Sequence, residues 1–300
     1  MEIIAVGDMH FGKELWFLQP NPFLKSNKEK LESIWASSTA SCIDFILDDI
    51  KKPLHFIFLG DLIDNPYIDD IWINKIKNIF LKITERQGIV SVILGNHDTN
   101  TTRLNTSKLS KIEIPNVYFY DKPFSYEKIL FLPYRKPSRL LNSLKNIKEK
   151  EFKYLFTHNN IYCNSFFMKT PMFHVKHLRE ILHSPKMIVY NGHLHRNLFD
   201  RTSGYFQPGS TAPTSFKEYP NAYGFIHISK NNKHRYYRNN RLFFISISNK
   251  ASLDAFKKFV INARKYKAKL CVKYSTLLKN NISYYLKYYK DVVVGVQESI

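Results

Sequence analysis

The chain has 300 residues, of which 44% are hydrophobic, so it can form one large domain or a large and a small one with buried cores. A formal net charge of +20 at pH 7 favours binding to polyanions. We expect no transmembrane helix and no signal peptide, because no long uncharged apolar run and no basic leader occur. Three scattered cysteines without a CxxC pair fit a reducing, cytoplasmic compartment.

The first hundred residues alternate between apolar runs and helical spacing. Strands are predicted at 2–6, 55–59 and 89–94, with helices at about 27–50 and 69–85 between them. This order predicts right-handed crossovers and a mostly parallel sheet. Each strand runs into a glycine followed by a polar residue, and ligands of such sheets bind beyond the carboxyl ends of the strands.

The middle of the chain predicts a second sheet. Short strands around a turn are expected in 117–132, a polar helix at about 138–150, and strands at 152–156 and 187–190. An alternating run within 204–229 favours a second sheet that is antiparallel in part. Two mixed sheets flanked by helices give an α/β fold of four layers.

The last part of the chain has its own composition and pattern. After Lys230–Lys233 the chain predicts, in order, a strand, a helix, a strand, a helix and a strand, at 241–248, about 252–265, 269–274, about 276–287 and 291–297. We therefore expect a domain of residues 1–235 and a small α/β domain of residues 236–300, with the boundary between 230 and 240.

Basic charge is concentrated in the C-terminal region. From Lys230 to Lys290 the sequence has sixteen Lys and Arg residues against one acid, Asp254, and eight tyrosines. Basic side chains neutralise phosphates, and aromatic faces stack on unpaired bases. The alternative is a lysine-rich solvated surface whose tyrosines belong largely to the core. We interpret the region as a polyanion-binding surface.

Five short clusters of polar residues follow the predicted strands. They are Gly7-Asp8-Met9-His10, Gly60-Asp61-Leu62-Ile63-Asp64, Gly95-Asn96-His97-Asp98, Thr157-His158 and Gly192-His193-Leu194-His195. A single Asp-x-His or His-x-His is usually a loop accident. Five such clusters in this order indicate one site.

The clusters contain the donors for two divalent cations. Side chains two residues apart in an extended segment point the same way, so Asp8 and His10 can share one ion, and His193 and His195 repeat that arrangement. We expect Asp61 to bridge the two ions with its two oxygens. Asn96 adds an amide oxygen and His158 another imidazole. Without thiolates the set suits manganese, iron or zinc.

Two such cations lie about 3.5–4 Å apart in known sites, clamp a phosphate and lower the pKa of bound water. His97 is not needed as a ligand. We expect it to donate a proton to the leaving oxygen or to steady the transition state, oriented by Asp64 or Asp98.

The order GDMH, GDLID, GNHD, TH, GHLH resembles the calcineurin-like metallophosphoesterases over residues 1 to about 200. Serine/threonine phosphatases of that superfamily carry Arg-Gly after the second motif, where this chain has Asn65-Pro66. Two stretches, residues 207–218 and Leu132-Pro133-Tyr134, are similar to stretches of SbcD-type DNA-repair nucleases. Two further features, residues 115–123 and the short length of the chain, are similar to those of phage-encoded members.

The resemblance implies a manganese-dependent DNA exonuclease and endonuclease, with Fe²⁺, Zn²⁺ or Mg²⁺ as other possible ions. It implies work in repair or recombination with an SbcC-type coiled-coil ABC ATPase, often as a nuclease dimer, in the host cytoplasm for a phage protein. It places the metal ligands on Asp8, His10, Asp61, Asn96, His158, His193 and His195, and the transition-state histidine on His97. The helices by which relatives grip the ATPase are not seen before Ile300.

Two other functions remain open. The first is the same chemistry on a phosphoprotein, a cyclic nucleotide or another small phosphoester. The second is a DNA-binding scaffold whose metal site is idle. The basic, tyrosine-rich region disfavours the first, and the full set of ligands disfavours the second.

Overall fold

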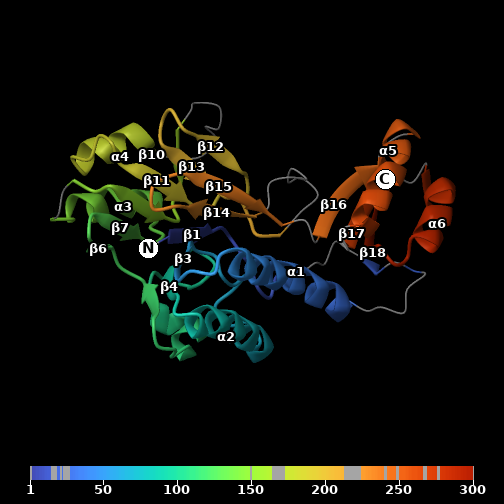
Figure 1. Ribbon diagram of the computed structural model, residues 1–300, viewed down its shortest axis with the longest axis horizontal. Helices are drawn as coiled ribbons and strands as arrows, with labels where there is room; N and C mark the ends of the chain where they lie inside the picture. The colour runs from blue at the N-terminus through green and yellow to red at the C-terminus, as the bar shows by residue number, and fades with distance from the viewer. Residues whose placement is uncertain are drawn as a thin grey trace. The chain divides into compact units, whose positions relative to one another are not determined.

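The computed structural model describes residues 2–14, 19–20, 22, 28–148, 151–163, 173–212, 224–239, 242–247, 250–265, 269–275 and 278–299 (Figure 1). The chain divides into two compact units. Unit 1 consists of Met1–Gly12, Leu47–Thr211 and Ala222–Tyr237, and unit 2 consists of Lys13–Ile46, Ala212–Asn221 and Arg238–Ile300. Segments far apart in sequence thus contribute to each unit.

The first sheet of unit 1 has six strands in the order β15 (His234–Arg238), β14 (Gly224–Ile228), β1 (Glu2–Val6), β3 (Leu54–Phe58), β4 (Ile89–Ile93) and β5 (Val117–Tyr120). The strands β1, β3, β4 and β5 are parallel, as expected, and β14 runs antiparallel to β1. α2 (Asp70–Glu85) is the crossover between β3 and β4 and buries Ile76, Phe80 and Ile83.

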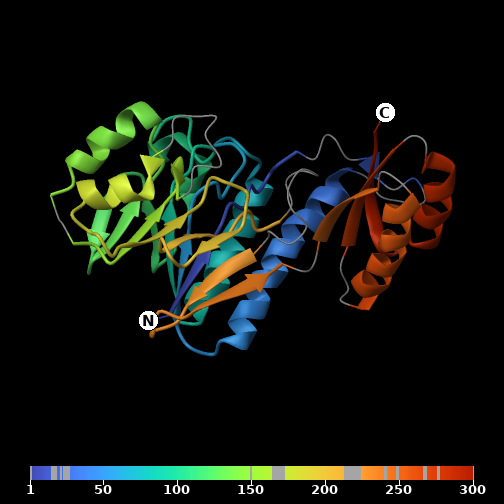
Figure 2. The same cartoon turned by 90° about the horizontal axis from the view of Figure 1, so that it is seen from above.

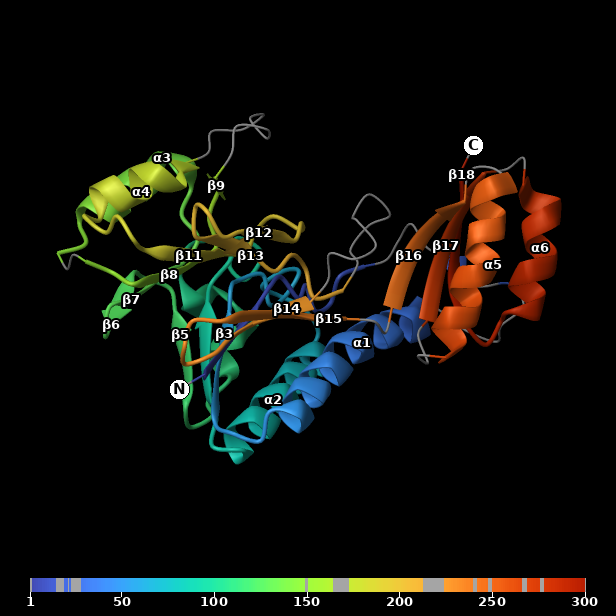
Figure 3. The same cartoon turned by 45° about the horizontal axis from the view of Figure 1, so that its top comes forward.

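The second sheet has the order β12 (Leu198–Asp200), β13 (Tyr205–Gln207), β11 (Ile188–Asn191), β8 (Tyr154–Thr157), β7 (Ile129–Leu132) and β6 (Phe124–Tyr126). Its four central strands are parallel, and β12 and β6 at the two edges are antiparallel to their neighbours. α3 (Pro137–Lys145) and α4 (Val175–Ile181) cover its outer face (Figure 3). The predicted α/β fold with two mixed sheets flanked by helices is confirmed.

One predicted strand belongs to a different sheet from the one we expected. The alternating run Gly224–Ile228 was predicted to lie in the second sheet, but as β14 it pairs with β1 in the first, with Ala5 opposite Ile226. Alternation of apolar and polar residues indicates that one face of a strand is buried, but it does not indicate which strand is the partner. The strand β15, which follows it, was not predicted at all.

The core of unit 1 has two layers because side chains alternate along each strand. Leu130 and Leu132 point to α3 and α4, whereas Phe131 points to the layer between the sheets. In that inner layer the aromatic rings of neighbouring strands stack, with ring centres 6.0 Å apart for Phe131–Phe156, 4.8 Å for Phe156–Tyr190 and 5.6 Å for Tyr190–Phe206. Ala5, Ile57 and Ile226 of the first sheet belong to the same buried core, so the two sheets pack face to face around it.

Unit 2 contains a four-stranded sheet in the order β16 (Leu242–Ile247), β17 (Lys269–Ser275), β18 (Val293–Ser299) and β2 (Gln19–Pro20). The first three strands are parallel and β2 is antiparallel. α5 (Lys250–Lys265) and α6 (Lys279–Tyr288) lie on one face of it (Figures 1 and 3), around a core that includes Phe256, Val260 and Ile282. Most of the 22-residue helix α1 (Lys28–Asp49) also falls in this unit.

Figure 2 shows the two C-terminal helices, in orange and red, on one side of the C-terminal strands. The remaining elements are short. β9 (Ile161–Tyr162) pairs with β10 (Phe173–His174), and the 3-10 helices η1 (Leu104–Thr106) and η2 (Lys108–Lys111) follow β4. No helix in the part of the chain that the structure describes is long and apolar enough to cross a membrane.

Candidate metal centre

The five clusters meet at one end of the two sheets of unit 1. Asp8 and His10 follow β1, Asp61 follows β3, and Asn96 and His97 follow β4 in the first sheet; His158 follows β8, and His193 and His195 follow β11 in the second. The strands are parallel within each sheet, so their carboxyl ends share an edge. The structure therefore brings the donors of the five clusters together from both sheets.

Asp8, His10 and His195 form the first group of donors. His10 Nε2 lies 3.0 Å from His195 Nε2, and His195 Nε2 lies 3.3 Å from Asp8 Oδ2. Donors bound to one ion at about 2.1 Å are separated by roughly 3.0–3.4 Å. The spacing of this group matches a shared cation.

Asp61, His158 and His193 form the second group. His158 Nε2 lies 3.2 Å from Asp61 Oδ2 and 3.2 Å from His193 Nδ1. Asn96 Oδ1 is also 3.2 Å from His158 Nε2, which brings the amide oxygen into the same group. Four donors thus surround a second cation-sized position.

Asp61 stands between the two groups. Its Oδ2 atom is 3.2 Å from His158 Nε2 and 3.8 Å from His10 Nε2, so one oxygen faces both positions. We expected both oxygens to bridge, but Oδ1 accepts the backbone N–H of His97 at 2.9 Å. That hydrogen bond fixes the carboxylate with Oδ2 turned to the shared position.

Hydrogen bonds at Nδ1 set the orientation of three imidazoles. His158 Nδ1 donates to the carbonyl of Leu59 at 2.6 Å, which leaves Nε2 for the site. His10 Nδ1 lies 3.0 Å from Asp64 Oδ1, and His97 Nδ1 lies 2.8 Å from the Asp64 carbonyl oxygen. A carboxylate or carbonyl behind a ligand histidine fixes its tautomer in this way.

The charges of the site favour a cation at its centre. Burial tends to lower the pKa of His158, but the carboxylates of Asp61 and Asp8 outweigh it and raise that pKa to about 9. Burial also tends to raise the pKa of Asp8, yet His158 and His195 lower it overall. A proton thus lies between two buried carboxylates, in the place where a divalent ion would balance the same charge.

One buried oxygen is short of partners. Asp8 Oδ2 accepts no hydrogen bond of good geometry within the described part of the chain. Buried carboxylate oxygens normally accept hydrogen bonds, so a buried oxygen that accepts none calls for a bound ion or a water. Together with the donor spacing, this oxygen shows that the residues fit a bound cation.

The backbone of the site is tight and strained. A Cβ on Gly95 would lie 2.1 Å from Asp61 Oδ1, so only glycine allows this approach of the two loops. His10, Asp61 and His193 have φ angles of 48°, 49° and 71°, in the left-handed region that non-glycine residues rarely adopt. Such strain gathers at functional sites, where the surrounding structure holds it.

Asp98 supports the loops rather than the His97 imidazole. It is fully buried, and its two oxygens accept the backbone N–H groups of Ile63 at 3.1 Å and Gly95 at 2.7 Å. It thereby ties the loop that carries Asp61 to the loop that carries His97. Burial and the nearby Asp61 charge raise the pKa of Asp98 to about 7.

Sequence reasoning gave Tyr134 no role at the site. Its ring centre lies 5.8 Å from that of His193 and 6.3 Å from that of His158. Its backbone N–H donates to Leu94 at 2.8 Å, so the loop after β7 is tied to the end of β4. The sequence held two signals for it: its place just after a strand, which it shares with the five clusters, and the similarity of Leu132-Pro133-Tyr134 to a stretch of DNA-repair nucleases.

This sandwich, with two adjoining groups of buried Asp and His donors, is that of a binuclear metallohydrolase. Residues 1–221 match the family of calcineurin-like phosphoesterases, and the chain belongs to that family. Its members hydrolyse phosphoester bonds with bound metal ions. Comparison with functionally curated proteins gave no significant match.

The chain is also similar to solved phosphatase structures. A cold-active protein-tyrosine phosphatase of the psychrophile Shewanella sp. has 11% sequence identity and a TM-score of 0.37, over 79% of this chain and 80% of that one. A point mutant of a cold-active protein tyrosine phosphatase has 11% identity and a TM-score of 0.36 over the same shares.

Proposed function

We propose that this chain is a two-metal phosphodiesterase that cuts DNA in repair or recombination. The metal centre supports phosphoester hydrolysis, and the C-terminal region supports a nucleic-acid substrate. The observation that supports a DNA substrate is the ratio of sixteen Lys and Arg residues to one acid from Lys230 to Lys290. A phosphatase of small anions needs no such extended basic segment.

Exposed tyrosines on α6 add to this proposal. Tyr284 and Tyr288 are 65% and 59% exposed, and their rings stack with centres 6.0 Å apart. Two parallel exposed rings beside the basic Lys287 and Lys290 offer faces for unpaired bases. Other tyrosines of the region, Tyr237 and Tyr274, are buried and serve the cores; Tyr266 lies outside the described residues.

The role of each site residue follows from its contacts. Asp8, His10, His195 and Asp61 would hold one ion, and Asp61, Asn96, His158 and His193 the other. Two bound divalent ions supply positive charge to the phosphoryl oxygens and lower the pKa of the attacking water. We propose Mn²⁺, with Fe²⁺, Zn²⁺ or Mg²⁺ as other candidates, because the donors are oxygens and imidazoles.

His97 is the proposed general acid. Its side chain is 41% exposed, so a substrate can reach it, and its Nδ1 is held by the Asp64 carbonyl. Nε2 is then the atom that gives a proton to the leaving oxygen or bonds to the transition state. Asp64 is a positioning residue, since its carboxylate contacts His10.

The domain and partner assignments stay proposals. We propose that residues 1–235 carry the nuclease chemistry and residues 236–300 bind DNA. A second copy of the chain and an SbcC-type coiled-coil ATPase are the proposed partners. Of the stretch similar to DNA-repair nucleases, residues 213–218 lie outside the described residues, whereas Gln207 donates to the carbonyls of Leu194 and Arg196 beside the site.

The test uses purified protein, Mn²⁺, end-labelled duplex and single-stranded DNA, and a nitrophenyl phosphate monoester. We expect DNA cleavage, its loss in His97→Ala, and retention of bound metal in that variant. Tyr284→Ala with Tyr288→Ala should weaken single-stranded DNA binding, by about 1–3 kcal/mol per stacked base. Changing the exposed tyrosines Tyr118 and Tyr126 to alanine is the matched control. Preference for the monoester over DNA would point to a phosphatase.

A further inference from the structure

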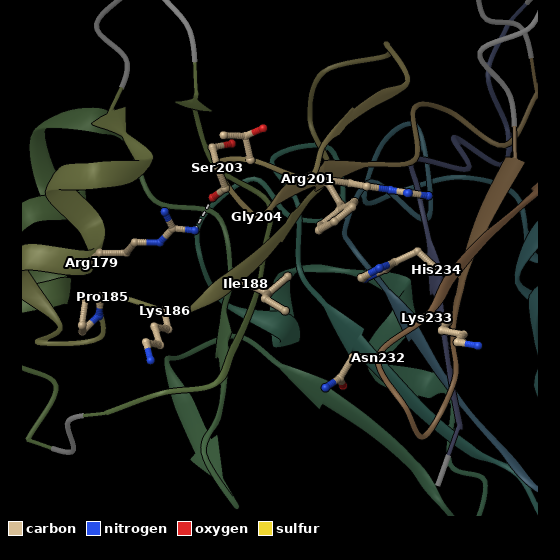
Figure 4. A pocket seen from close by; sticks show the side chains of 12 residues that line it. Arg179, Pro185, Lys186, Ile188, Arg201, Ser203, Gly204, Asn232, Lys233 and His234 are labelled. Atoms are coloured by element: carbon tan, nitrogen blue, oxygen red, sulfur yellow. Dashed lines mark hydrogen bonds between the residues drawn. The ribbon is translucent and has the colours of Figure 1, made fainter.

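A pocket of unit 1 lies at the other end of β11 from the metal centre. Its volume is about 790 Å³, and its lining includes Ile188, the first residue of β11, and Gly204, which precedes β13. His234, the first residue of β15, closes it from the first sheet (Figure 4). The metal donors His193 and His195 follow the last residue of β11, so the two sites are separate.

The charge of this pocket is positive. Arg179, Lys186, Arg201 and Lys233 contribute four cationic side chains to the wall, and no acid is found among the described residues that line it. Figure 4 shows them on different elements around one hollow. Asp200 lies behind the wall, where its Oδ1 accepts the backbone N–H groups of Thr202 and Ser203, so the cations outnumber the acids around the pocket and favour an anion.

Arg179 is held in place rather than free in solvent. Its Nε and Nη2 atoms donate to the Met187 carbonyl at 2.9 and 2.7 Å, and Nη2 also donates to Ser203 O. These hydrogen bonds fix the plane of the guanidinium at the pocket wall. These bonds use Nε and both hydrogens of Nη2, so Nη1 is the donor left for an oxyanion, and it loses little freedom on binding because the guanidinium is already oriented.

An aromatic surface stands beside the cations. The rings of Phe206 and His234 stack with centres 4.1 Å apart and an angle of 16°. His234 Nε2 lies 2.6 Å from the Tyr190 hydroxyl, which fixes the imidazole. Burial and the nearby Arg201 lower the pKa of His234, which favours the neutral ring. The pocket thus joins a flat neutral wall to a cationic rim.

We propose that this pocket binds a phosphate group, carried by a mononucleotide-sized ligand or by a nucleic-acid backbone. Pockets of about 300–1,000 Å³ hold such small ligands. The cations of the rim would take the phosphate oxygens, and the partly exposed His234 imidazole, backed by the buried Phe206, would take an attached ring. The site does not depend on the metal centre or on the proposed nuclease function.

The experiment follows the backbone amides of Ile188 and Gly204 by NMR, in the full chain loaded with a diamagnetic divalent ion. The probes are inorganic phosphate, adenosine monophosphate, adenosine and a single-stranded oligonucleotide without terminal phosphates. We expect phosphate-bearing probes to shift both amides and adenosine to bind at least about tenfold more weakly. If the oligonucleotide binds more tightly than the monophosphate, the ligand is a nucleic-acid backbone. If the monophosphate binds more tightly, the ligand is a small phosphorylated molecule.

Charge reversal decides whether the pocket is responsible. Arg201 and Lys233 are exposed, so Arg201→Glu with Lys233→Glu should leave the fold intact and weaken phosphate binding at least about tenfold. Lys122→Glu with Lys145→Glu makes the same change in net charge at exposed positions outside the lining, and should change the affinity less than about twofold. Equal affinities of the two double variants, or unshifted amides with every phosphate, would overturn the proposal.

Discussion

The protonation of His158 makes the stability of the metal-free protein depend on pH. The pKa of His158 is raised from 6.5 to about 9 by Asp61 and Asp8, against the opposing effect of burial. A histidine with a raised pKa in the folded state contributes its stability fully below about pH 6.5 and loses it as pH rises through about 9. The difference corresponds to on the order of 3 kcal/mol of unfolding free energy.

The assay is thermal unfolding of chelator-treated protein at pH 6 and pH 9.5. We expect the midpoint to be about 5–10 °C lower at the higher pH. Protein loaded with a divalent ion should show a smaller change, since the ion takes the place of the proton between the carboxylates.

The matched control is His158→Gln, which removes the titrating group but keeps a polar side chain. Its midpoint should be lower at pH 6 and should fall less by pH 9.5 than that of the wild type, because the titration of His158 is gone, while Asp98, whose pKa is about 7, still titrates at the centre in this range. If the metal-free wild type and this variant showed the same dependence on pH, the proton between Asp8 and Asp61 would not be the source, and the electrostatic reasoning for the centre would be wrong.

Three further substitutions test how the loops hold the donors. Asp64→Ala removes the carboxylate behind the buried His10 and should weaken metal binding about 10–100-fold, as measured by calorimetry, while lowering the unfolding midpoint less than Asp98→Ala does. Gly95→Ala places a Cβ 2.1 Å from Asp61 Oδ1 and should lower stability by about 1–3 kcal/mol and reduce hydrolysis; wild-type activity would refute this. Asp98→Ala leaves two buried backbone N–H groups without acceptors and should cost about 2–4 kcal/mol in denaturant unfolding, more than Asp98→Asn.

The sequence predicted the parts of the site that follow from parallel strands. The strands at 2–6, 55–59 and 89–94 were predicted within a residue or so, because their apolar runs are continuous and end at glycines. Parallel strands in one sheet bring their carboxyl ends together whatever the side chains are. The convergence of Asp8, Asp61 and Asn96 therefore required only local patterns.

Contacts between residues far apart in the sequence could not be predicted from local sequence patterns. β15, His-Arg-Tyr-Tyr-Arg, has few apolar residues because it is the edge strand of its sheet, and we placed the domain boundary there. α4 has seven residues, too few for helical periodicity to stand out. The contact of Asp64 with His10 joins residues 54 apart, and the place of Tyr134 depends on the packing of two sheets.

The left-handed backbone at His10, Asp61 and His193 has a consequence for engineering. Glycine would relax the backbone by roughly 1 kcal/mol at each position, yet it would delete a metal donor. At Asp61 and His10 it would also remove a stabilising partner, of His97 and His158 in the first case and of Asp64 in the second. Random mutagenesis with heat selection alone should therefore enrich glycine at His193 and yield stable but inactive protein. Selection for enzymatic turnover must therefore accompany selection for heat resistance. Stabilising substitutions are safer at positions far from this edge of the sheets.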